Sequence, residues 1–459
     1  MCGILGMVSQ NKNVAKSLYI GLYALQHRGK ESAGITTSDG KNYYHYSDMG
    51  EVGFVFRGDV LNSLLGSCGI AQNRYSTAGR SNYQNTQPIR GYFHGEEFWL
   101  AHNGNLVNSD NLKKYCLAKQ YFTAADVISD TRVIVALIAL SKASSFVEAL
   151  TEVFTRLHGA FSIVVLYKED IIVIRDSFGF RPLHIGQKDN DFIVASETCV
   201  FDHLGASEIR EVRPGEISII DKYGIQEYFQ AEETNRKFCI FEFIYFLRPD
   251  SKVFGRRVYK TREKMGQFLA QECPAEADLV IPIPDSGKYA GIGFIRESKL
   301  GDGSEALFRP HTVSRTFIEP VQTLREQGVE LKFNIISEEV AGKKVVTVDD
   351  SVVRGTTEKR MALRLRKAGA LEVHHRVSSP PYRWPCYYGI DTYRIKGELV
   401  AARHHGDISK VKEEMGLDSL GYLKLEKVIK AIIETNGKSL NENDFCTACF
   451  TGRYPLKLA

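Results

Sequence analysis

The chain has 459 residues, of which 43% are hydrophobic and 25% charged, and its 59 Lys and Arg against 55 Asp and Glu give a formal net charge of +4. This composition is that of a folded protein and excludes wholesale disorder, while the length predicts about two or three domains. So small a net charge gives no reason to expect nucleic acid or an anionic membrane as a partner.

The N-terminus and the cysteines both favour a reducing compartment. The opening MCGILGMVSQ has no basic segment and only a short apolar one, so we expect no signal peptide. The longest apolar stretches, such as Val133–Leu140, are much shorter than the roughly 18 residues of a membrane-spanning helix. Nine cysteines are an odd number, which argues against a disulfide framework. We therefore expect a cytoplasmic protein whose cysteines serve chemistry or a metal.

The first half of the chain alternates short strands with amphipathic helices. Hydrophobic periodicity predicts helices over 13–26 and 129–140, and strands over 69–75, 98–100, 160–167, 171–175 and 192–196. The segment EYFQAEETNRK (227–237) then turns polar and is the candidate domain boundary. We place the two predicted domains at residues 2–232 and 233–459.

Strands and helices alternate regularly after this boundary. Strands are expected over 278–284 and 342–348, a helix over 356–368 that ends at Gly369, and a further strand from Val373. Such alternation predicts a parallel sheet with crossover helices. We therefore expect an α/β second half behind a mixed α+β first half.

Cys2 follows the initiator Met, and a second residue this small usually permits removal of that Met. The mature chain would then begin with a cysteine that carries both a thiol and a free α-amino group. With a reference pKa of about 7.7–8.0, this amine can act as the base for its own nucleophile. The alternative is an incidental residue on a first strand, which is the better explanation of Met-Cys-Gly in isolation.

Two polar segments near the N-terminus accompany Cys2. HRGKESAG (27–34) is a glycine-punctuated loop after an amphipathic helix, and NRYSTAG (73–79) places Arg74 at the end of an apolar strand. An arginine in that position could hold a carboxylate through two hydrogen bonds. Each segment alone is better explained as a turn, a cap or a surface pair.

Two further segments offer groups that could act on a carbonyl substrate. AHNGNL (101–106) presents the Asn103 amide beside the Gly104 N–H on a predicted turn, which suits the stabilisation of an oxyanion. SDTR (129–132) offers Asp130 at a helix start, either as an N-cap or as the partner of a substrate ammonium group.

Taken together and in this order, these segments resemble the N-terminal-nucleophile domain of the class II glutamine amidotransferases. RDSFGFRPL (175–183) and ASE (195–197) belong to the same resemblance, which covers about half of the chain. It implies an αββα sandwich in which Cys2 attacks the glutamine carboxamide, while Asn103 and the Gly104 N–H stabilise the oxyanion.

The resemblance also implies how glutamine is bound. Arg74 would hold the α-carboxylate of glutamine, Asp130 its α-amino group, and Arg28 would help to shape the site.

The segment VVTVDDSVVRGTT (345–357) carries paired acids after an apolar run. Asp349 and Asp350 at the end of a strand could bind vicinal ribose hydroxyls and lie near Mg²⁺, a cation that prefers oxygen ligands. Donors for a phosphate follow in the loop and at the helix start: Ser351, Gly355, Thr356 and Thr357. The alternative is a capped turn with two solvated aspartates.

This segment matches the signature of the type I phosphoribosyltransferases, which bind phosphoribosyl pyrophosphate. With a glutaminase domain in front of it, the chain resembles the glutamine phosphoribosylpyrophosphate amidotransferases over nearly its whole length. The resemblance implies that ammonia from glutamine passes through an internal channel to C1 of phosphoribosyl pyrophosphate. The products would be 5-phosphoribosylamine, glutamate and pyrophosphate, at the first step of purine synthesis.

Other parts of the resemblance concern ligands and assembly. Ser286 of IPIPDSG (281–287) would join Asp349 and Asp350 around Mg²⁺, and Arg315 of RTFIEP would bind phosphoribosyl pyrophosphate. The family further implies purine nucleotides as candidate feedback inhibitors and a homotetramer.

The cysteines divide into two groups. Cys446 and Cys449 form a CxxC pair that is compatible with zinc, a redox pair or chance. The resemblance adds Cys239 and Cys386, which match the remaining ligand positions of family members with a [4Fe–4S] cluster; zinc would accept the same four thiolates. Buried inert thiols are expected at the other four positions: Cys68, Cys116, Cys199 and Cys273.

Two alternative functions remain open at this stage. A non-catalytic sensor of phosphoribosyl pyrophosphate, of the kind in which this fold binds nucleic acid, is suggested by segment 309–314, which departs from the family pattern. Intact Cys2 and Asn103 argue against it. A relative that delivers ammonia to a different phosphoribosyl acceptor is the other alternative.

Overall fold

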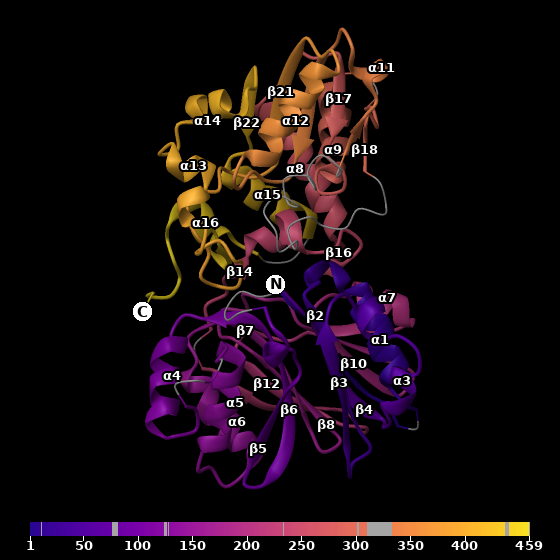
Figure 1. The fold of residues 1–459 in the computed structure, drawn as a ribbon, viewed down its shortest axis with the longest axis vertical. Coiled ribbons are helices and arrows are strands. Elements are labelled where there is room, and N and C mark those ends of the chain that lie inside the picture. Colours follow the sequence, from indigo (N-terminus) through magenta and orange to yellow (C-terminus); the bar gives the residue numbers. More distant parts are fainter. Residues whose placement is uncertain are drawn as a thin grey trace.

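The computed structural model describes residues 1–10, 12–75, 81–123, 126, 128–232, 234–300, 303–309, 333–436 and 440–458. The first half of the chain forms one lobe and the second half another, and the N-terminus lies between them (Figure 1). Arg315 and most of the atypical segment 309–314 lie outside the described residues. No helix within the described ranges is long and apolar enough to cross a membrane.

The first lobe contains two antiparallel sheets. One has seven strands in the order β11-β9-β10-β1-β4-β2-β3 and the other six in the order β13-β12-β8-β7-β6-β5. The strands of the first are β1 (Gly3–Val8), β2 (Ser32–Ser38), β3 (Tyr43–Met49), β4 (Cys68–Arg74), β9 (His184–Lys188), β10 (Asp191–Ala195) and β11 (Ser207–Glu211). Those of the second are β5 (Ile89–Phe93), β6 (Glu96–Leu106), β7 (Gly159–Tyr167), β8 (Asp170–Arg175), β12 (Glu216–Ile220) and β13 (Ile225–Gln230).

The two sheets pack face to face and are covered by helices on their outer faces. Because successive side chains of a strand point to opposite faces, Ile4 packs between the sheets with Val164, whereas its neighbour Leu5 packs under helix α1 with Leu18. The helices are α1 (Ala15–Ala24) and α7 (Cys199–Leu204) on the first sheet, and α4 (Ser109–Ala118), α5 (Asp130–Leu140) and α6 (Phe146–Arg156) on the second. The predicted αββα sandwich is confirmed.

Short helices fill the connections of this lobe: η1 (Gln26–Arg28), α2 (Val52–Val55), α3 (Val60–Ser63) and η2 (Tyr83–Asn85).

The second lobe is built on a parallel sheet, as predicted. Its strands run in the order β17 (Leu279–Pro282), β20 (Lys344–Asp349), β21 (Glu372–Val377) and β22 (Ser419–Tyr422). The longer helices are α8 (Val258–Glu272), α9 (Lys288–Ser298), α12 (Thr356–Lys367), α14 (Ile408–Met415) and α15 (Leu425–Asn436). The helix predicted over 356–368 thus ends one residue early, and Gly369 follows it with a φ of 96°.

Small elements complete this lobe. The paired short strands are β14 (Phe238–Cys239) with β23 (Phe445–Cys446), β15 (Lys252–Val253) with β16 (Arg256–Arg257), and β18 (Leu307–Phe308) with β19 (Asn334–Ile335). The short helices are η3 (Glu242–Phe246), α11 (Ser337–Val340), η5 (Lys396–Glu398), α13 (Val400–Arg403), η6 (Glu442–Asp444) and α16 (Ala448–Thr451).

Candidate active site

Cys2 lies directly before the central strand β1 and is buried. Its backbone N–H donates a hydrogen bond of 3.1 Å to Asn103 Oδ1, and the next N–H, of Gly3, donates one of 2.9 Å to Asn73 Oδ1. The Cys2 thiol lies 3.6 Å from the carbonyl oxygen of Tyr75. Two asparagine side chains, Asn73 from the adjacent strand β4 and Asn103 from β6 of the other sheet, therefore hold the peptide groups on either side of Cys2.

Asn103 and Gly104 lie inside strand β6, so the predicted turn over 101–106 is wrong. Both residues pair with β7, Asn103 opposite Ser162 and Gly104 opposite Phe161. A Cβ on Gly104 would stand 1.9 Å from the carbonyl oxygen of Ala160. The glycine is therefore needed for the close approach of β7, and it does not mark the end of the strand.

The side-chain amide of Asn103 has an unused donor. Its Oδ1 accepts the Cys2 N–H, whereas Nδ2 is buried and has no hydrogen-bond partner among the described residues. A buried N–H without a partner is costly, typically by about 1–3 kcal/mol. A substrate oxygen bound beside Cys2 would satisfy this group.

A small cavity of about 10 Å³ opens beside Cys2. Its lining is Cys2, Arg74, Tyr75, Gln87, His102, Gly104, Ser129, Asp130 and Thr131. A larger cavity of about 350 Å³ shares Ser129 and Asp130 with it and is also lined by Tyr387 and Tyr393 of the second lobe. The structure thus brings Cys2, Arg74, Gly104 and Asp130 together.

Asp130 is the first residue of α5, and Ser129 is the N-cap, whose Oγ accepts the N–H of Arg132. The carboxylate of Asp130 keeps a free oxygen: Oδ1 accepts the Thr131 N–H at 2.8 Å, but Oδ2 accepts no hydrogen bond within the described structure. His102 Nδ1 lies 3.8 Å from Oδ2, and burial lowers the pKa of this histidine. The imidazole is therefore neutral at pH 7, which leaves Asp130 able to take a cationic ligand.

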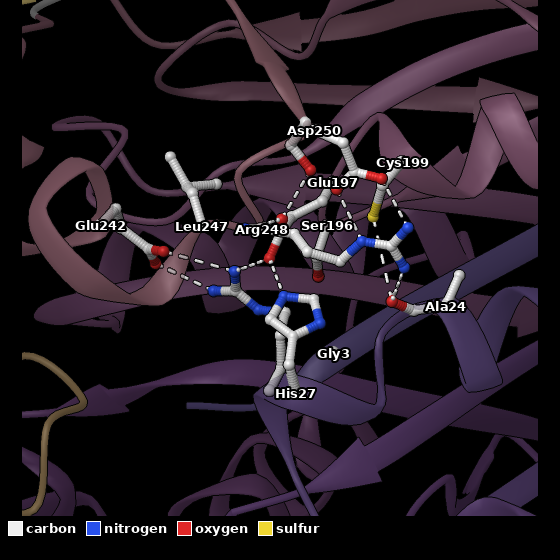
Figure 2. A network of polar contacts seen from close by, with 12 residues as sticks. Gly3, Ala24, His27, Ser196, Glu197, Cys199, Glu242, Leu247, Arg248 and Asp250 are labelled. Atoms are coloured by element: carbon white, nitrogen blue, oxygen red, sulfur yellow. Dashed lines mark hydrogen bonds and ion pairs between the residues drawn. The ribbon is translucent and has the colours of Figure 1, made fainter. Parts of the chain in front are cut away.

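The two arginines predicted to bind glutamine differ in position. Arg74 ends β4, lines the small cavity and lies 3.9 Å from Glu31. Arg28 is buried outside the lining: its Nε donates to the Cys2 carbonyl oxygen at 3.0 Å, and its two Nη groups pair with Glu197 and Glu242 (Figure 2). Burial disfavours the charge of Arg28, but the two carboxylates outweigh it and raise the pKa of the guanidinium.

Met1 still precedes Cys2 in this chain and is buried. Burial lowers the pKa of its α-amino group to about 5. While Met1 is attached, the nitrogen of Cys2 is an amide and cannot act as a base, so the predicted role of the Cys2 amine requires removal of Met1.

The paired acids of the second lobe lie at the carboxyl edge of its sheet. Asp349 ends β20, and because the adjacent β17 runs parallel, the segment PDSG (284–287) reaches the same edge. Ser286 Oγ donates a hydrogen bond of 2.9 Å to Asp349 Oδ1, and a Cβ on Gly287 would stand 2.2 Å from the carbonyl oxygen of Val348. The structure thus brings Ser286 and the aspartates together.

Asp350, which is buried like Asp349, carries the second carboxylate of this edge. Its Oδ1 accepts the Ser351 hydroxyl at 3.2 Å, while its buried Oδ2 has no hydrogen-bond partner among the residues described. Burial and then the charge of Asp349 raise the pKa of Asp350 well above its usual range. Two adjacent carboxylates and a hydroxyl are a donor set that suits Mg²⁺, which usually takes one or two carboxylates and keeps its other ligands as water and phosphate.

The loop after the aspartates leads into the N-terminus of α12. Gly355 is the N-cap with a φ of 78°, a conformation that favours glycine, and Thr356 and Thr357 are the first helical residues. No side chain among the described residues caps this end, and an uncapped helix start offers its backbone N–H groups and the positive end of its dipole to an anion.

Comparisons with known proteins agree with this geometry. Residues 72–203 match the glutamine amidotransferase domain family. The amidophosphoribosyltransferase of Methanocaldococcus jannaschii is 41% identical over 100% of this chain and 98% of its own length. The chain belongs to the amidophosphoribosyltransferase family. The protein of the same name from Synechocystis sp. is 42% identical over 99% of this chain and 91% of its own length.

Comparison with solved structures shows that this amidophosphoribosyltransferase family member also shares the fold of the family. The glutamine phosphoribosylpyrophosphate amidotransferase from B. subtilis, complexed with ADP and GMP, superposes with a TM-score of 0.91 at 39% identity. The match covers 100% of this chain and 98% of that chain. The chain is accordingly an enzyme, a glutamine-dependent transferase.

The four cysteines singled out in the sequence gather in the second lobe of this family member. Cys239 and Cys446 lie opposite each other in the parallel pair β14–β23, and Cys449 and Cys386 interact electrostatically with both. Burial raises the pKa of Cys239 to about 11 and raises those of Cys446 and Cys449. Among the described residues, however, no group of three or more His, Cys, Asp or Glu side chains is arranged to hold a metal ion.

The sequence did not single out several residues of the amidophosphoribosyltransferase site. Gln87 and Thr131 line the small cavity and bond to each other at 3.0 Å, and Gln87 Oε1 also accepts the His102 N–H. Glu197 and Glu242 clamp Arg28. Thr131 and Glu197 lie in the segments SDTR and ASE, where no role was assigned to them. Glu242 could have been found as an acid within the aromatic run FEFIYF, where a charged residue needs a buried partner.

Proposed function

We propose that this chain transfers ammonia from glutamine to C1 of phosphoribosyl pyrophosphate, with residues 2–232 as the glutaminase and residues 233–459 as the phosphoribosyltransferase. The reaction forms 5-phosphoribosylamine, glutamate and pyrophosphate, at the first step of purine biosynthesis. The observation that carries the proposal is the Asn103 amide, whose oxygen accepts the Cys2 N–H while its Nδ2 has no partner in the described structure.

In the glutaminase step the Cys2 thiol attacks the carboxamide carbon of glutamine. Once Met1 is removed, the α-amino group of Cys2 takes the thiol proton, directly or through a water. The tetrahedral oxyanion receives hydrogen bonds from Asn103 Nδ2 and the Gly104 N–H. Ammonia leaves, the thioester remains on Cys2, and water releases glutamate.

The two ends of glutamine are bound on either side of this centre. Asp130 takes the α-amino group with its free Oδ2, and Arg74 takes the α-carboxylate. Arg28 shapes the site through the Cys2 carbonyl. The cavity of about 350 Å³ that shares Asp130 is large enough for an amino acid and is our candidate for the approach of glutamine.

In the second lobe, Asp349 and Asp350 bind the ribose hydroxyls, and four residues donate to a phosphate: Ser351, Gly355, Thr356 and Thr357. Mg²⁺ held by Ser286, Asp349 and Asp350 would neutralise charge on the departing pyrophosphate. Arg315, which we also expect to contact the substrate, lies outside the described residues.

We further propose that Cys239, Cys386, Cys446 and Cys449 hold a [4Fe–4S] cluster. The mutual proximity of these four thiols supports this ligand set, and zinc is the competing occupant. The solved B. subtilis relative is complexed with ADP and GMP, which supports purine nucleotides as regulators of this chain.

A cytoplasmic homotetramer is the assembly we propose, in line with the family. All nine cysteines lie in the described part of the chain and are free, which fits a reducing compartment.

The decisive experiment measures pyrophosphate release from phosphoribosyl pyrophosphate and Mg²⁺, first with glutamine and then with ammonium chloride, together with product analysis. We expect release and 5-phosphoribosylamine with either nitrogen source. Binding of phosphoribosyl pyrophosphate without release would instead favour the non-catalytic sensor. A different aminated product would favour a relative that delivers ammonia to another phosphoribosyl acceptor.

A further inference from the structure

A buried carboxylate of the second lobe reaches the glutaminase centre of the first. Glu242 begins the short π-helical turn η3, directly after β14. Its Oε1 accepts Arg28 Nη2 at 2.9 Å and its Oε2 accepts Arg28 Nη1 at 3.3 Å, so this one carboxylate holds the guanidinium through two hydrogen bonds (Figure 2). Arg28 and Glu242 are 214 positions apart in the chain.

We propose that Glu242 is a positioning residue for the Cys2 nucleophile, acting through Arg28. The proposal rests on the proposed glutaminase function and adds a residue that the second lobe contributes to it. Arg28 Nε donates to the carbonyl oxygen of Cys2, and this carbonyl belongs to the peptide unit that carries the nucleophile. Glu242 therefore lies two contacts from Cys2.

The Cys2 carbonyl matters because few other groups orient this residue. After removal of Met1 no residue precedes Cys2, so its amine and thiol are oriented by the Cys2–Gly3 peptide and by Asn103. Rotation of that peptide moves both reacting groups about Cα. A planar guanidinium clamped by carboxylates restricts this rotation better than a single flexible donor does.

Both carboxylates that pair with Arg28, those of Glu197 and Glu242, depend on the second lobe. Glu197 comes from the first lobe, but its Oε2 accepts the Arg248 N–H at 2.8 Å and the Ser251 hydroxyl at 2.7 Å (Figure 2). Its Oε1 pairs with Arg28 and His27. The segment from Glu242 to Ser251 thus holds one carboxylate and supplies the other.

The turn that carries Glu242 is itself anchored. Arg262 of α8 donates from Nε to the Phe243 carbonyl at 2.9 Å and from Nη2 to the Leu247 carbonyl at 2.7 Å. Arg181 adds a second buried cation, with Nη1 3.2 Å from Glu242 Oε1. A carboxylate shared by two buried arginines on an anchored turn is held in a defined place, as a positioning role requires.

The test is Glu242→Gln, which keeps size and one acceptor but removes the charge. We expect the kcat for glutamine hydrolysis to fall about 10-fold or more, since small displacements of a reacting group cost this much, with glutamine KM within about twofold. Ammonia-dependent synthesis should stay within about twofold of wild type. Glu242→Asp, which keeps the charge, should recover part of the loss.

Alkylation of Cys2 by iodoacetamide gives a second readout that needs no phosphoribosyl chemistry. We expect slower alkylation in Glu242→Gln, and this readout remains informative even if the wild-type protein makes no phosphoribosylamine. The matched control is Glu216→Gln, an equally buried carboxylate that pairs with Arg210 and Arg213 away from the site. It should leave alkylation and the ratio of glutamine to ammonia activity unchanged.

The proposal is overturned if folded Glu242→Gln keeps the wild-type kcat and alkylation rate, or if it loses glutamine and ammonia activities equally. Should Glu242→Gln fail to fold, Glu242→Asp carries the test alone. A selective loss of glutaminase rate in that variant supports positioning, and an unchanged ratio of the two activities refutes it.

Discussion

The backbone N–H of Cys2 donates a hydrogen bond of 3.1 Å to Asn103 Oδ1, from a residue 101 positions away. This bond decides the orientation of the Asn103 amide, because the oxygen must face Cys2 and the nitrogen must then face elsewhere. Nδ2 is left buried and without a partner among the described residues. The same contact therefore anchors Cys2 and leaves Nδ2 as the donor that we propose for the oxyanion.

Replacing Cys2 with alanine removes the thiol and leaves the phosphoribosyl lobe untouched. We expect Cys2→Ala to lose glutamine-dependent activity while ammonium-dependent activity persists, measured as pyrophosphate release with each nitrogen source. Cys68→Ala, a buried thiol elsewhere in the first lobe, is the control that should retain both. Simultaneous loss of both activities in a folded Cys2→Ala protein would count against the assignment.

Gly104→Ala tests the close approach of β6 and β7. The new Cβ would lie 1.9 Å from the Ala160 carbonyl oxygen, so the strand must shift at the oxyanion position. We expect a loss of about 1–3 kcal/mol in the free energy of unfolding, measured in urea, together with a selective loss of glutaminase rate. Gly224→Ala, where nothing lies within 4 Å of the new Cβ, should change neither quantity.

Asp349→Ala is expected to abolish activity with glutamine and with ammonia alike, because the acceptor site would be lost. The carboxylate ends β20 and accepts the Ser286 hydroxyl, so the substitution removes a contact shared by two loops. Isothermal titration with phosphoribosyl pyrophosphate and Mg²⁺ should show lost binding, while Cys2 alkylation stays at the wild-type rate. Retained ammonia-dependent synthesis would show that the substrate binds elsewhere.

The cluster proposal predicts iron and labile sulfide in anaerobically purified protein, with broad visible absorbance. Cys446→Ser should lose iron because one of four ligands is removed, whereas Cys273→Ser, whose thiol bonds to the Tyr422 carbonyl, should keep it. Zinc in place of iron, by metal analysis, would support the same four ligands with the other occupant. If freshly purified protein contained neither iron nor zinc, both forms of the proposal would be ruled out.

Asp176 gives the fold a predictable pH dependence. Burial raises its pKa to about 6 although the carboxylate accepts three backbone N–H groups, among them those of Phe161 and Phe178. Its folded pKa exceeds the unfolded value, so its stabilising contribution is complete below about pH 4 and is lost as the pH rises through 6. The loss amounts to roughly 3 kcal/mol at about 1.4 kcal/mol per pKa unit.

Urea unfolding of wild type and Asp176→Asn at pH 4 to 7 measures this contribution. The difference in unfolding free energy between the two proteins should shrink or change sign as the pH rises to about 6.5 and then level off. Asp59→Asn, at an exposed aspartate, is measured alongside as the reference substitution. A difference that stays constant over this pH range for Asp176→Asn would contradict the prediction.

The local sequence pattern was enough to predict those elements that have a clear hydrophobic period or a residue that ends them. The helix predicted over 356–368 is α12, because apolar residues recur along one face and Gly369 adopts the positive φ that ends it. The αββα sandwich was implied by the family resemblance, and the parallel sheet followed from the alternation of strands and helices. The segment 101–106 was predicted as a turn because Asn and Gly favour turns, yet tertiary packing makes it part of β6.

The sequence by itself determined the residues for which we propose roles: a thiol at position 2, the Asn103 amide, paired aspartates at a strand end and four cysteines. It did so because each lies in a short motif whose spacing is local. Only the tertiary structure decided that Asn103 turns its oxygen to Cys2 and that Glu242 clamps Arg28 across the two lobes. Such contacts join residues more than a hundred positions apart, so they depend on how sheets and lobes pack and leave no trace in local spacing.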